Sequence, residues 1–221
     1  MSDPPEEHVL RWVSARLSEN GTFFDVGAHY GWMSMVAAHR VGPGGHVVSF
    51  EPSPALFDIL QYHKRLNGLK QIQLVEAAVS NANGGTVALF LINEGLSFRN
   101  SLTIGEDDTP YLTSSQKTRI DVASITLDGF VLSSGMVPDV IKIDVEGAEL
   151  LVLEGAQAVL STYHPVLILG THPFWLPRTQ SIEQIFAVLN RHDYRIVEEH
   201  TVTFGDTYLA DYLCVQSARD K

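Results

Sequence analysis

The overall composition excludes several classes of protein. The chain has 221 residues and a formal net charge of −11. This acidity argues against nucleic-acid and anionic-membrane partners, because phosphate groups are bound by clustered Lys and Arg. The first seven residues are polar and acidic, so they predict no signal peptide, and no apolar run approaches the roughly 20 residues of a membrane span. The single cysteine, Cys214, cannot form an internal disulfide. These features favour a cytoplasmic protein with one domain over residues 1–221.

The first eighty residues alternate between segments typical of helices and segments typical of strands. Residues 1–20 form an N-terminal segment with a helix over 6–18. Strands are expected over 22–26, 46–50 and 72–79, and helices over 32–40 and from Pro54 to about Asn67. Alternation of this kind favours an α/β fold in which helices cover a mainly parallel sheet.

The alternation is interrupted over 84–125. Strand-like runs at 86–92 and near Ile120 flank a polar stretch in which a loop is expected over 97–110. We interpret 84–125 as a hairpin and loop inserted beside the main sheet. Its polar part, over 94–117, contains Phe98, Arg99, Asn100 and Tyr111 and is expected to shape a substrate pocket.

The alternation then resumes to the end of the chain. A short helix capped by Thr126 is expected through Leu132, followed by strands over 140–145 and 166–169 and helices over 147–160 and 180–191. The last two strands are expected over 194–198 and 208–215, with a turn at Gly205 and Asp206. Two consecutive strands with a tight turn must be antiparallel, so a parallel sheet that ends in an antiparallel hairpin is predicted.

The first motif with a chemical meaning is the run DVGAHYG over Asp25–Gly31, between a strand and a helix. Glycines there let the backbone approach a ligand, and the following helix presents free N–H groups. The run is not the G-x-G-x-x-G pattern of dinucleotide sites, and an acid before the glycines suits a cationic ammonium group. The alternative is a glycine turn that only packs the helix against the strand.

The second motif is Glu51, which ends the second expected strand 20 residues after Gly31 and precedes Pro52. An acid at this spacing accepts hydrogen bonds from two ribose hydroxyls. Together with Asp25, Glu51 favours S-adenosylmethionine over NAD as the nucleoside ligand. The alternative is that Glu51 only caps the next helix.

The third motif is IKIDVEGAE over 141–149, where three carboxylates crowd the start of a helix. Asp144 is a candidate functional residue because it lies at the carboxyl end of a strand, and Glu146 follows it. Glu149 is interpreted as a helix-start charge or a structural hydrogen-bond acceptor. Lys142, within a buried-type run, is expected to pair with a carboxylate.

His172 follows the fifth expected strand. A lone histidine is usually structural, but this one shares its position with other polar residues at the carboxyl ends of strands, where open α/β sheets bind ligands. Those residues are Asp25, Glu51, Glu76 and Asp144. As bases for a hydroxyl acceptor we rank Asp144 first, then His172, then Glu146. The chain has no paired Cys/His spacing, so no structural zinc site is expected.

The chain resembles the FkbM family of S-adenosylmethionine-dependent methyltransferases. The matching segments are FFDVGAHYGWMS (23–34), FEPSPALFDIL (50–60), EAAVSNANGG (76–85), TLDGF (126–130) and DVIKIDVEGAELLVLEGA (139–156). The resemblance implies a Rossmann-like class I methyltransferase fold with seven strands and a reversed last strand. It also implies O-methylation of a hydroxyl on a small molecule such as a sugar or a polyketide-type natural product.

The resemblance also assigns site residues. It implies that the methionine part of the cofactor lies on the turn with Asp25, Gly27, Ala28, His29, Tyr30 and Gly31. Glu51 and Pro52 would lie at the ribose, Glu76 to Ala78 at the adenine, and Asp144 beside the transferred methyl group.

One departure from the family pattern concerns the acceptor side of the site. Gly170 stands where the family usually has an acidic residue, two positions before His172. Because no second and third ligand for Asp144 can be seen in the sequence, no metal is expected. Two other functions stay open: a non-catalytic module that binds S-adenosylmethionine or a partner, and an NAD-linked oxidoreductase, which the missing G-x-G-x-x-G pattern disfavours.

Overall fold

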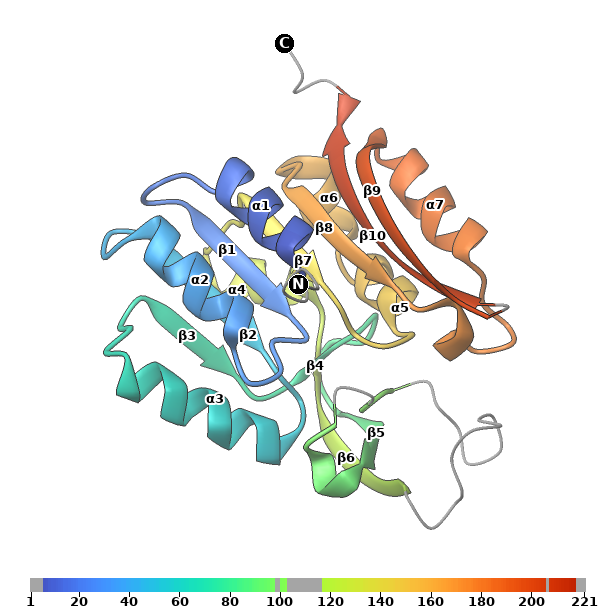
Figure 1. Ribbon diagram of the computed structural model, residues 1–221, viewed down its shortest axis with the longest axis horizontal. Coiled ribbons are helices and arrows are strands. Elements are labelled where there is room, and N and C mark those ends of the chain that lie inside the picture. Colours follow the sequence, from blue (N-terminus) through green and yellow to red (C-terminus); the bar gives the residue numbers. More distant parts are fainter. Residues whose placement is uncertain (1–5, 98–99, 103–116, 206, 218–221) are drawn as a thin grey trace.

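The computed structural model has a central seven-stranded sheet with helices on both faces (Figure 1). It describes residues 6–97, 100–102, 117–205 and 207–217. The strands of the central sheet are β1 (Thr22–Val26), β2 (His46–Phe50), β3 (Ile72–Val75), β7 (Val140–Ile143), β8 (Val166–Thr171), β9 (Tyr194–Phe204) and β10 (Thr207–Gln216). The α-helices are α1 (Glu7–Arg16), α2 (Trp32–Val41), α3 (Pro54–Leu66), α4 (Leu127–Ser134), α5 (Glu149–Glu154), α6 (Gln157–Thr162) and α7 (Ile182–Arg191).

The order of the strands confirms the predicted fold class. The sheet runs β3-β2-β1-β7-β8-β10-β9. All neighbouring pairs from β3 to β8 are parallel, whereas β10 is antiparallel to both β8 and β9. The strand order therefore reverses direction at β1, which lies between β2 and β7. Open α/β sheets bind ligands in the crevice beyond the carboxyl ends of the strands at such a point.

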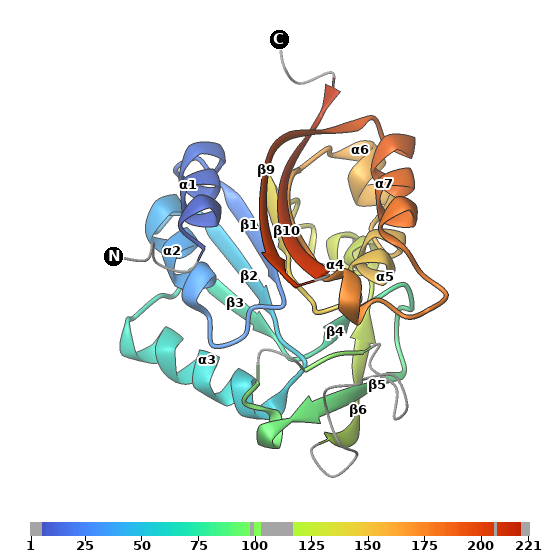
Figure 2. The same ribbon diagram turned by 45° about the vertical axis from the view of Figure 1, so that its right-hand side comes forward.

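Two apolar clusters attach the helices to opposite faces of the sheet. On one face α1 and α2 pack against Phe23 and Val47, and on the other α4 to α7 pack against Phe24 and Val48. Figure 2 shows α1 and α2 on one side of the sheet and α5 to α7 on the other. Successive side chains of a strand point to opposite faces, so the strands between two helical layers are mainly apolar on both faces.

The strand predicted over 72–79 is divided between two sheets. Residues 72–75 form β3 in the central sheet, whereas β4 (Ala78–Val79) pairs in parallel with Ser124 and Ile125 of a second sheet. The second sheet has the order β4-β6-β5, in which β5 (Thr86–Ile92) and β6 (Lys117–Ile125) are antiparallel. The chain leaves the central sheet after Val75, whose carbonyl accepts a hydrogen bond from the backbone of Glu51.

The segment around Asp144 also differs from the prediction. β7 ends at Ile143 instead of Val145, and the chain then turns at Glu146 and Gly147, which have positive φ angles of 52° and 95°. The helix expected over 147–160 is two helices, α5 and α6, which are separated at Gly155 and Ala156. Another difference from the prediction is that β9 continues to Phe204, six residues beyond its expected end.

Several expected features fall partly or wholly outside the described residues. These are Phe98, Arg99, Tyr111, most of the loop expected over 97–110, and Asp206 of the final turn. Within the described part, a 3-10 turn η1 (Asn93–Gly95) follows β5, and Ser101 pairs with Phe90 in an isolated bridge. No described helix is long and apolar enough to cross a membrane.

Candidate functional site

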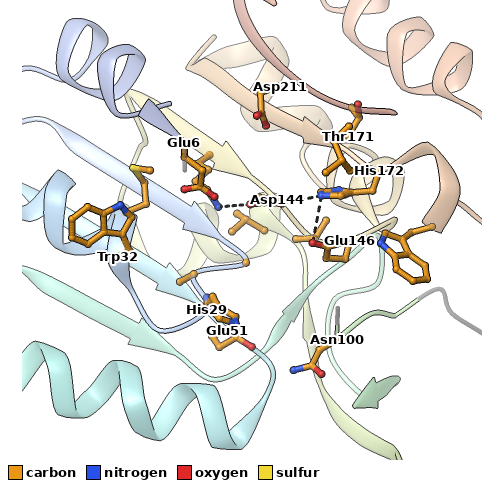
Figure 3. Close-up of a pocket in the computed structure, with 18 of the residues that line it drawn as sticks. Glu6, His29, Trp32, Glu51, Asn100, Asp144, Glu146, Thr171, His172 and Asp211 are labelled. Atoms are coloured by element: carbon orange, nitrogen blue, oxygen red, sulfur yellow. Dashed lines mark hydrogen bonds and ion pairs between the residues drawn. The ribbon is translucent and has the colours of Figure 1, made fainter. Parts of the chain in front are cut away.

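A cleft of about 1960 Å³ opens beyond the carboxyl ends of β1, β2 and β7 (Figure 3). Ligand pockets usually measure roughly 300–1,000 Å³, so this cleft has room for a cofactor and an acceptor together. The predicted site residues that line it are Gly27, Ala28, His29, Tyr30, Glu51, Pro52, Ala78, Asp144, Glu146 and His172. Asn100 also lines it, whereas Asp25, Gly31 and Glu76 do not.

The β1–α2 turn is pressed against the end of β7. The backbone N–H groups of Gly27 and Ala28 both donate to the carbonyl of Phe50, at 3.1 and 3.0 Å. Gly27 has φ +79°, and a β-carbon there would lie 1.9 Å from the carbonyl oxygen of Asp144. Only glycine therefore allows the two loops to meet. This contact supports the alternative that Gly27 serves to pack the turn against its neighbour. The turn also lines the cleft, so packing does not exclude ligand binding.

Glu51 lies at the end of β2 with only 5% of its surface exposed. Its Oε2 accepts a hydrogen bond from His29 N (2.8 Å) and its Oε1 accepts one from Ser53 N (2.9 Å). Burial raises the pKa of Glu51 to about 7, although these two backbone donors act in the opposite direction. Ser53 is the N-cap residue of α3, so Glu51 holds the backbone just before that helix, but among the described residues it accepts no hydrogen bond from an N–H group of the helix itself. The same carboxylate also borders the cleft, with each oxygen held in a fixed direction.

Asp25 lies outside the cleft, and the expectation that it directly holds a ligand ammonium group is not supported. The residue is fully buried, and its Oδ2 accepts a hydrogen bond from Ser34 Oγ at 2.5 Å. Its Oδ1 lies 3.6 Å from Lys142 Nζ, and Lys142 Nζ lies 3.2 Å from Asp144 Oδ2. Lys142 therefore pairs with carboxylates as predicted. Burial lowers the pKa of Lys142, but the charges of Asp144 and Asp25 outweigh burial and raise it.

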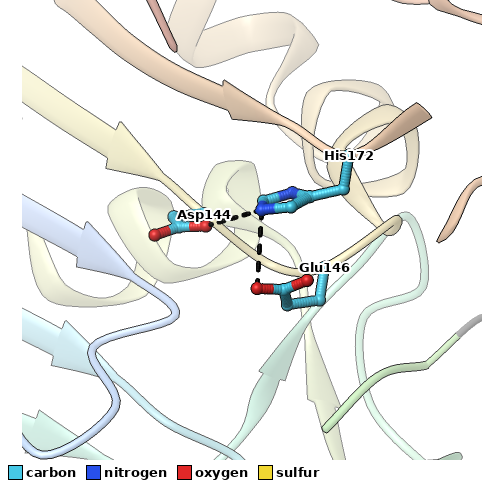
Figure 4. A group of neighbouring side chains, drawn as sticks. All are labelled: Asp144, Glu146 and His172. Atoms are coloured by element: carbon cyan, nitrogen blue, oxygen red, sulfur yellow. Dashed lines mark ion pairs between the residues drawn. The ribbon is translucent and has the colours of Figure 1, made fainter. Parts of the chain in front are cut away.

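Asp144, Glu146 and His172 meet at one edge of the cleft (Figure 4). His172 Nε2 lies 3.5 Å from Asp144 Oδ1 and 3.4 Å from Glu146 Oε1. Burial opposes the charge on the imidazole, but the hydrogen bond to Glu149 and the nearby carboxylates raise the pKa of His172 to about 10. This raised pKa favours the protonated imidazole, whereas the role of base that the sequence predicts for His172 needs the neutral form.

Glu149 orients the histidine from the opposite side. It is fully buried at the start of α5, and its Oε1 lies 2.7 Å from His172 Nδ1. The same oxygen accepts a hydrogen bond from Gly147 N at 3.0 Å. The prediction that Glu149 is a structural hydrogen-bond acceptor is thereby confirmed. The loop itself is held by Ser101 Oγ, which donates to the carbonyl of Glu146 at 2.6 Å.

The space beside Gly170 is filled by Asp211, a residue that the sequence analysis missed. Gly170 on β8 and Asp211 on β10 are direct partners in the antiparallel pairing. Asp211 Oδ2 lies 2.7 Å from His8 Nε2 on α1, and both residues line the cleft. The only signal for Asp211 in the sequence is a charged residue within an otherwise apolar last strand.

The comparisons with known proteins agree with this geometry. The profile of the methyltransferase FkbM domain matches residues 25–196. The FkbM methyltransferase of Methylobacillus flagellatus KT is 18% identical with a TM-score of 0.58, over 89% of this chain and 44% of that chain. The chain thus spans less than half the length of that structure. No curated protein sequence matches.

Two further solved structures share the fold. The precorrin-6y C5,15-methyltransferase of Geobacter metallireducens GS-15 is 13% identical with a TM-score of 0.55, over 97% of this chain and 90% of that chain. The magnesium protoporphyrin IX methyltransferase ChlM of Synechocystis PCC 6803, with bound S-adenosylmethionine, is 13% identical with a TM-score of 0.54, over 96% and 77%.

The strand order and the position of the cleft at the β1 switch point are those of the Rossmann-like methyltransferase fold. The family match covers most of the chain. The protein accordingly belongs to the FkbM methyltransferase family.

Proposed function

We propose that this chain transfers a methyl group from S-adenosylmethionine to a hydroxyl oxygen of a small-molecule acceptor. The observation that carries the proposal is that one cleft holds both a buried carboxylate suited to a ribose, Glu51, and the polar cluster of Asp144, Glu146 and His172. A cleft with both features can bind a nucleoside beside a group that needs deprotonation.

The residues of the cleft fit the cofactor. The two backbone donors on Glu51 fix its carboxylate, and each oxygen keeps a lone pair that can accept from a ribose hydroxyl. His29 Nε2 is buried and has no hydrogen bond among the described residues, so it offers a polar contact to a ligand. The proposed cofactor-binding residues are those that line the cleft: Gly27, Ala28, His29, Tyr30, Glu51, Pro52, Ala78 and Asp144. Gly31 lies outside the cleft, where the absence of a side chain leaves room for Leu60. Asp25 acts indirectly, through Lys142.

The chemistry divides between the cofactor and the chain. When bound, the cofactor supplies an electrophilic methyl group, so that a lone pair of the acceptor oxygen forms the C–O bond while the C–S bond breaks and its electron pair stays on sulfur. The chain holds the acceptor hydroxyl and takes its proton. Asp144 is the first candidate base because its carboxylate lines the cleft at the end of β7. His172 and Glu146 flank it, and a placed base contributes roughly 10²–10⁴-fold.

Calorimetry on the purified chain tests the cofactor assignment. We expect S-adenosylmethionine and S-adenosylhomocysteine to bind and NAD to give no heat. Tight binding of NAD without any response to S-adenosylhomocysteine would favour the oxidoreductase alternative instead. Formation of S-adenosylhomocysteine in the presence of a panel of sugars and polyketide-type alcohols then tests the acceptor class.

The non-catalytic alternative makes a different prediction. A module that only binds the cofactor would show the same calorimetry but would form no S-adenosylhomocysteine with any acceptor in that panel. Asp211 favours the enzyme, because it brings a carboxylate to the position beside Gly170 where the family pattern has an acid. The expected cytoplasmic location stays a prediction.

A further inference from the structure

The cluster of Asp144, Glu146 and His172 has the composition of a metal site. One possible ligand atom from each residue lies within 4.8 Å of the other two. Ligands at about 2.1 Å on opposite sides of an ion are about 4.2 Å apart, so small side-chain rotations bring all three to one centre. Figure 4 shows the imidazole directed between the two carboxylates.

The distances within the cluster fit a shared ion better than a direct ion pair. Charge-assisted N–H···O bonds measure about 2.7–2.9 Å, whereas His172 Nε2 lies 3.4 and 3.5 Å from its two carboxylate oxygens. Two ligands at about 2.1 Å from one ion lie about 3.4 Å apart at a tetrahedral angle and about 3.0 Å apart at a right angle. The observed separations match the edges of such a coordination sphere.

The histidine is oriented in the way that metal-binding histidines are. His172 is 7% exposed, and its Nδ1 lies 2.7 Å from a fully buried oxygen of Glu149. A carboxylate on one ring nitrogen fixes the ring and directs the other nitrogen at the metal, an arrangement common around protein-bound metals. Among the described residues, Oε2 of Glu149 makes no hydrogen bond, and Oε1 contacts the imidazole of His172 and the backbone of Gly147. We therefore give Glu149 the role of holding the imidazole in place.

The local charge also favours a cation. Asp144, Glu146 and Glu149 surround the imidazole, and Asp211 lies beside Asp144 across Gly170. Lys142 is close enough to neutralise one of these charges. Of the two carboxylate oxygens of Asp144, its Nζ is paired with Oδ2. Oδ1 of Asp144, which faces His172, is thus available to an ion.

We propose that Asp144, Glu146 and His172 bind one divalent transition-metal ion at the edge of the cleft. One imidazole with two carboxylates favours Mn²⁺, Fe²⁺ or Zn²⁺, because Mg²⁺ and Ca²⁺ prefer sites built from oxygen alone. This replaces the expectation that no metal is used. That expectation rested on the absence of further ligands for Asp144, and the structure brings Glu146 and His172 to it.

The role of the ion rests on the proposed methyl transfer, whereas its binding does not. Three protein ligands leave open positions toward the cleft, as in catalytic metal sites. An acceptor hydroxyl bound there becomes more acidic and loses its proton to water in the open part of the cleft. With the ion in place, the three side chains act as its ligands, and this route for the proton replaces direct removal by Asp144.

Binding of Mn²⁺ to the full chain tests the site directly. The chain is treated with EDTA, desalted and titrated with MnCl₂, and free Mn²⁺ is followed by electron paramagnetic resonance. We expect one ion per chain, with at least tenfold weaker binding in Glu146→Gln and in His172→Ala. Electron spin-echo spectra should show coupling to one imidazole nitrogen in the wild-type protein and none in His172→Ala. Zn²⁺ should displace Mn²⁺, and Mg²⁺ should not.

Two matched variants serve as controls. Glu19→Gln removes an exposed carboxylate that does not line the cleft and should leave Mn²⁺ binding unchanged. Asp211→Asn removes a carboxylate beside the cluster and should change affinity less than threefold. Equal losses in Asp211→Asn and Glu146→Gln would show an ion held by diffuse negative charge and would overturn the proposal, as would the absence of a nitrogen coupling or of binding at millimolar Mn²⁺.

Calorimetry with S-adenosylhomocysteine in EDTA separates this proposal from the proposed function. If S-adenosylhomocysteine binds and Mn²⁺ does not, the ion site is wrong and the cofactor assignment stands. If Mn²⁺ binds with the nitrogen coupling and S-adenosylhomocysteine does not bind, the ion site stands and the cofactor assignment is wrong. Circular dichroism of each variant confirms that it is folded.

Discussion

Asp211 Oδ1 lies 3.1 Å from the point that a β-carbon on residue 170 would occupy, so Gly170 and Asp211 share one space at the edge of the cleft. Asp144 Oδ1 lies 3.4 Å from the same point. The neighbouring strand thus brings a carboxylate to the place where β8 has no side chain. The pairing of Gly170 with Asp211 in the β8–β10 register makes this arrangement possible.

A double-mutant cycle at positions 170 and 211 tests whether turnover needs a carboxylate in this space, whichever of the two strands carries it. Gly170→Asp alone should lower turnover, because a second carboxylate would be forced against Asp211 and Asp144. Asp211→Gly alone should also lower it, because the carboxylate is lost. Gly170→Asp combined with Asp211→Gly returns one carboxylate to the same space and should recover a large part of the activity. Additive losses in the double variant would show that Asp211 has no role beyond its pairing with His8.

The second prediction concerns the ribose contact of Glu51. Glu51→Ala should weaken S-adenosylhomocysteine binding by on the order of 1.5–3 kcal/mol, because two hydrogen bonds to a charged acceptor are lost. Glu19→Ala is the matched control, since Glu19 is exposed and does not line the cleft. Calorimetry measures both variants. An affinity in Glu51→Ala equal to that of the wild-type protein would reduce Glu51 to a residue that only orders the start of α3.

The pKa of Glu51 leads to a third prediction. Burial raises that pKa from an ordinary value of 4.5 to about 7. A raised pKa in the folded state means that the stabilising contribution of this group is fully present below about pH 4.5 and is lost as pH rises through 7. Glu51→Gln loses one of the two backbone hydrogen bonds at every pH, but it is free of this penalty, so its stability relative to the wild-type protein should improve from pH 5 to pH 8 by at most on the order of 3 kcal/mol.

Chemical denaturation of wild-type and Glu51→Gln protein at pH 5 and pH 8 measures this effect. The free energy of unfolding of Glu51→Gln minus that of the wild-type protein should be more positive at pH 8, where the wild-type carboxylate is ionised. In the wild-type protein, S-adenosylhomocysteine affinity should rise from pH 6 to pH 8, because the ionised carboxylate is the stronger acceptor. A stability difference that does not change with pH would show that Glu51 is ionised throughout this range.

The parts of the fold that the sequence predicts are those with a local cause. Strands such as β1 and β2 are mainly apolar because both faces of the sheet are covered, and glycines mark the ends of helices such as α2 and α4. The division of 72–79 has no local signal, since Ala78 and Val79 are as apolar as the residues of β3. Which sheet they join depends on β6, some forty residues later in the chain.

The candidate site shows the same limit. The positions of Asp144 and His172 at strand ends can be predicted, because the carboxyl ends of parallel strands lie at one edge. The approach of Glu146 to His172 depends on positive φ angles at residues 146 and 147. Because position 146 is not a glycine, the sequence does not predict a positive φ angle there. Asp211 and His8 reach the cleft only through the β8–β10 pairing and the packing of α1, which are contacts between distant parts of the sequence.

The last prediction separates chemistry from binding at the cluster. Asp144→Asn and His172→Ala should each lower kcat by roughly 10²-fold or more, the contribution expected of a group that assists removal of the acceptor proton. His172→Ala should bind S-adenosylhomocysteine nearly as well as the wild-type protein does. Asp144→Asn should bind it somewhat less well, since Asp144 also borders the proposed cofactor site. If His172 only contacts the acceptor, His172→Ala should raise the acceptor KM and leave kcat unchanged. Steady-state kinetics with the first acceptor found in the panel measures both constants. An unchanged kcat in both variants would mean that alignment of the two substrates, and not ionisation of the hydroxyl, is the main contribution of the chain.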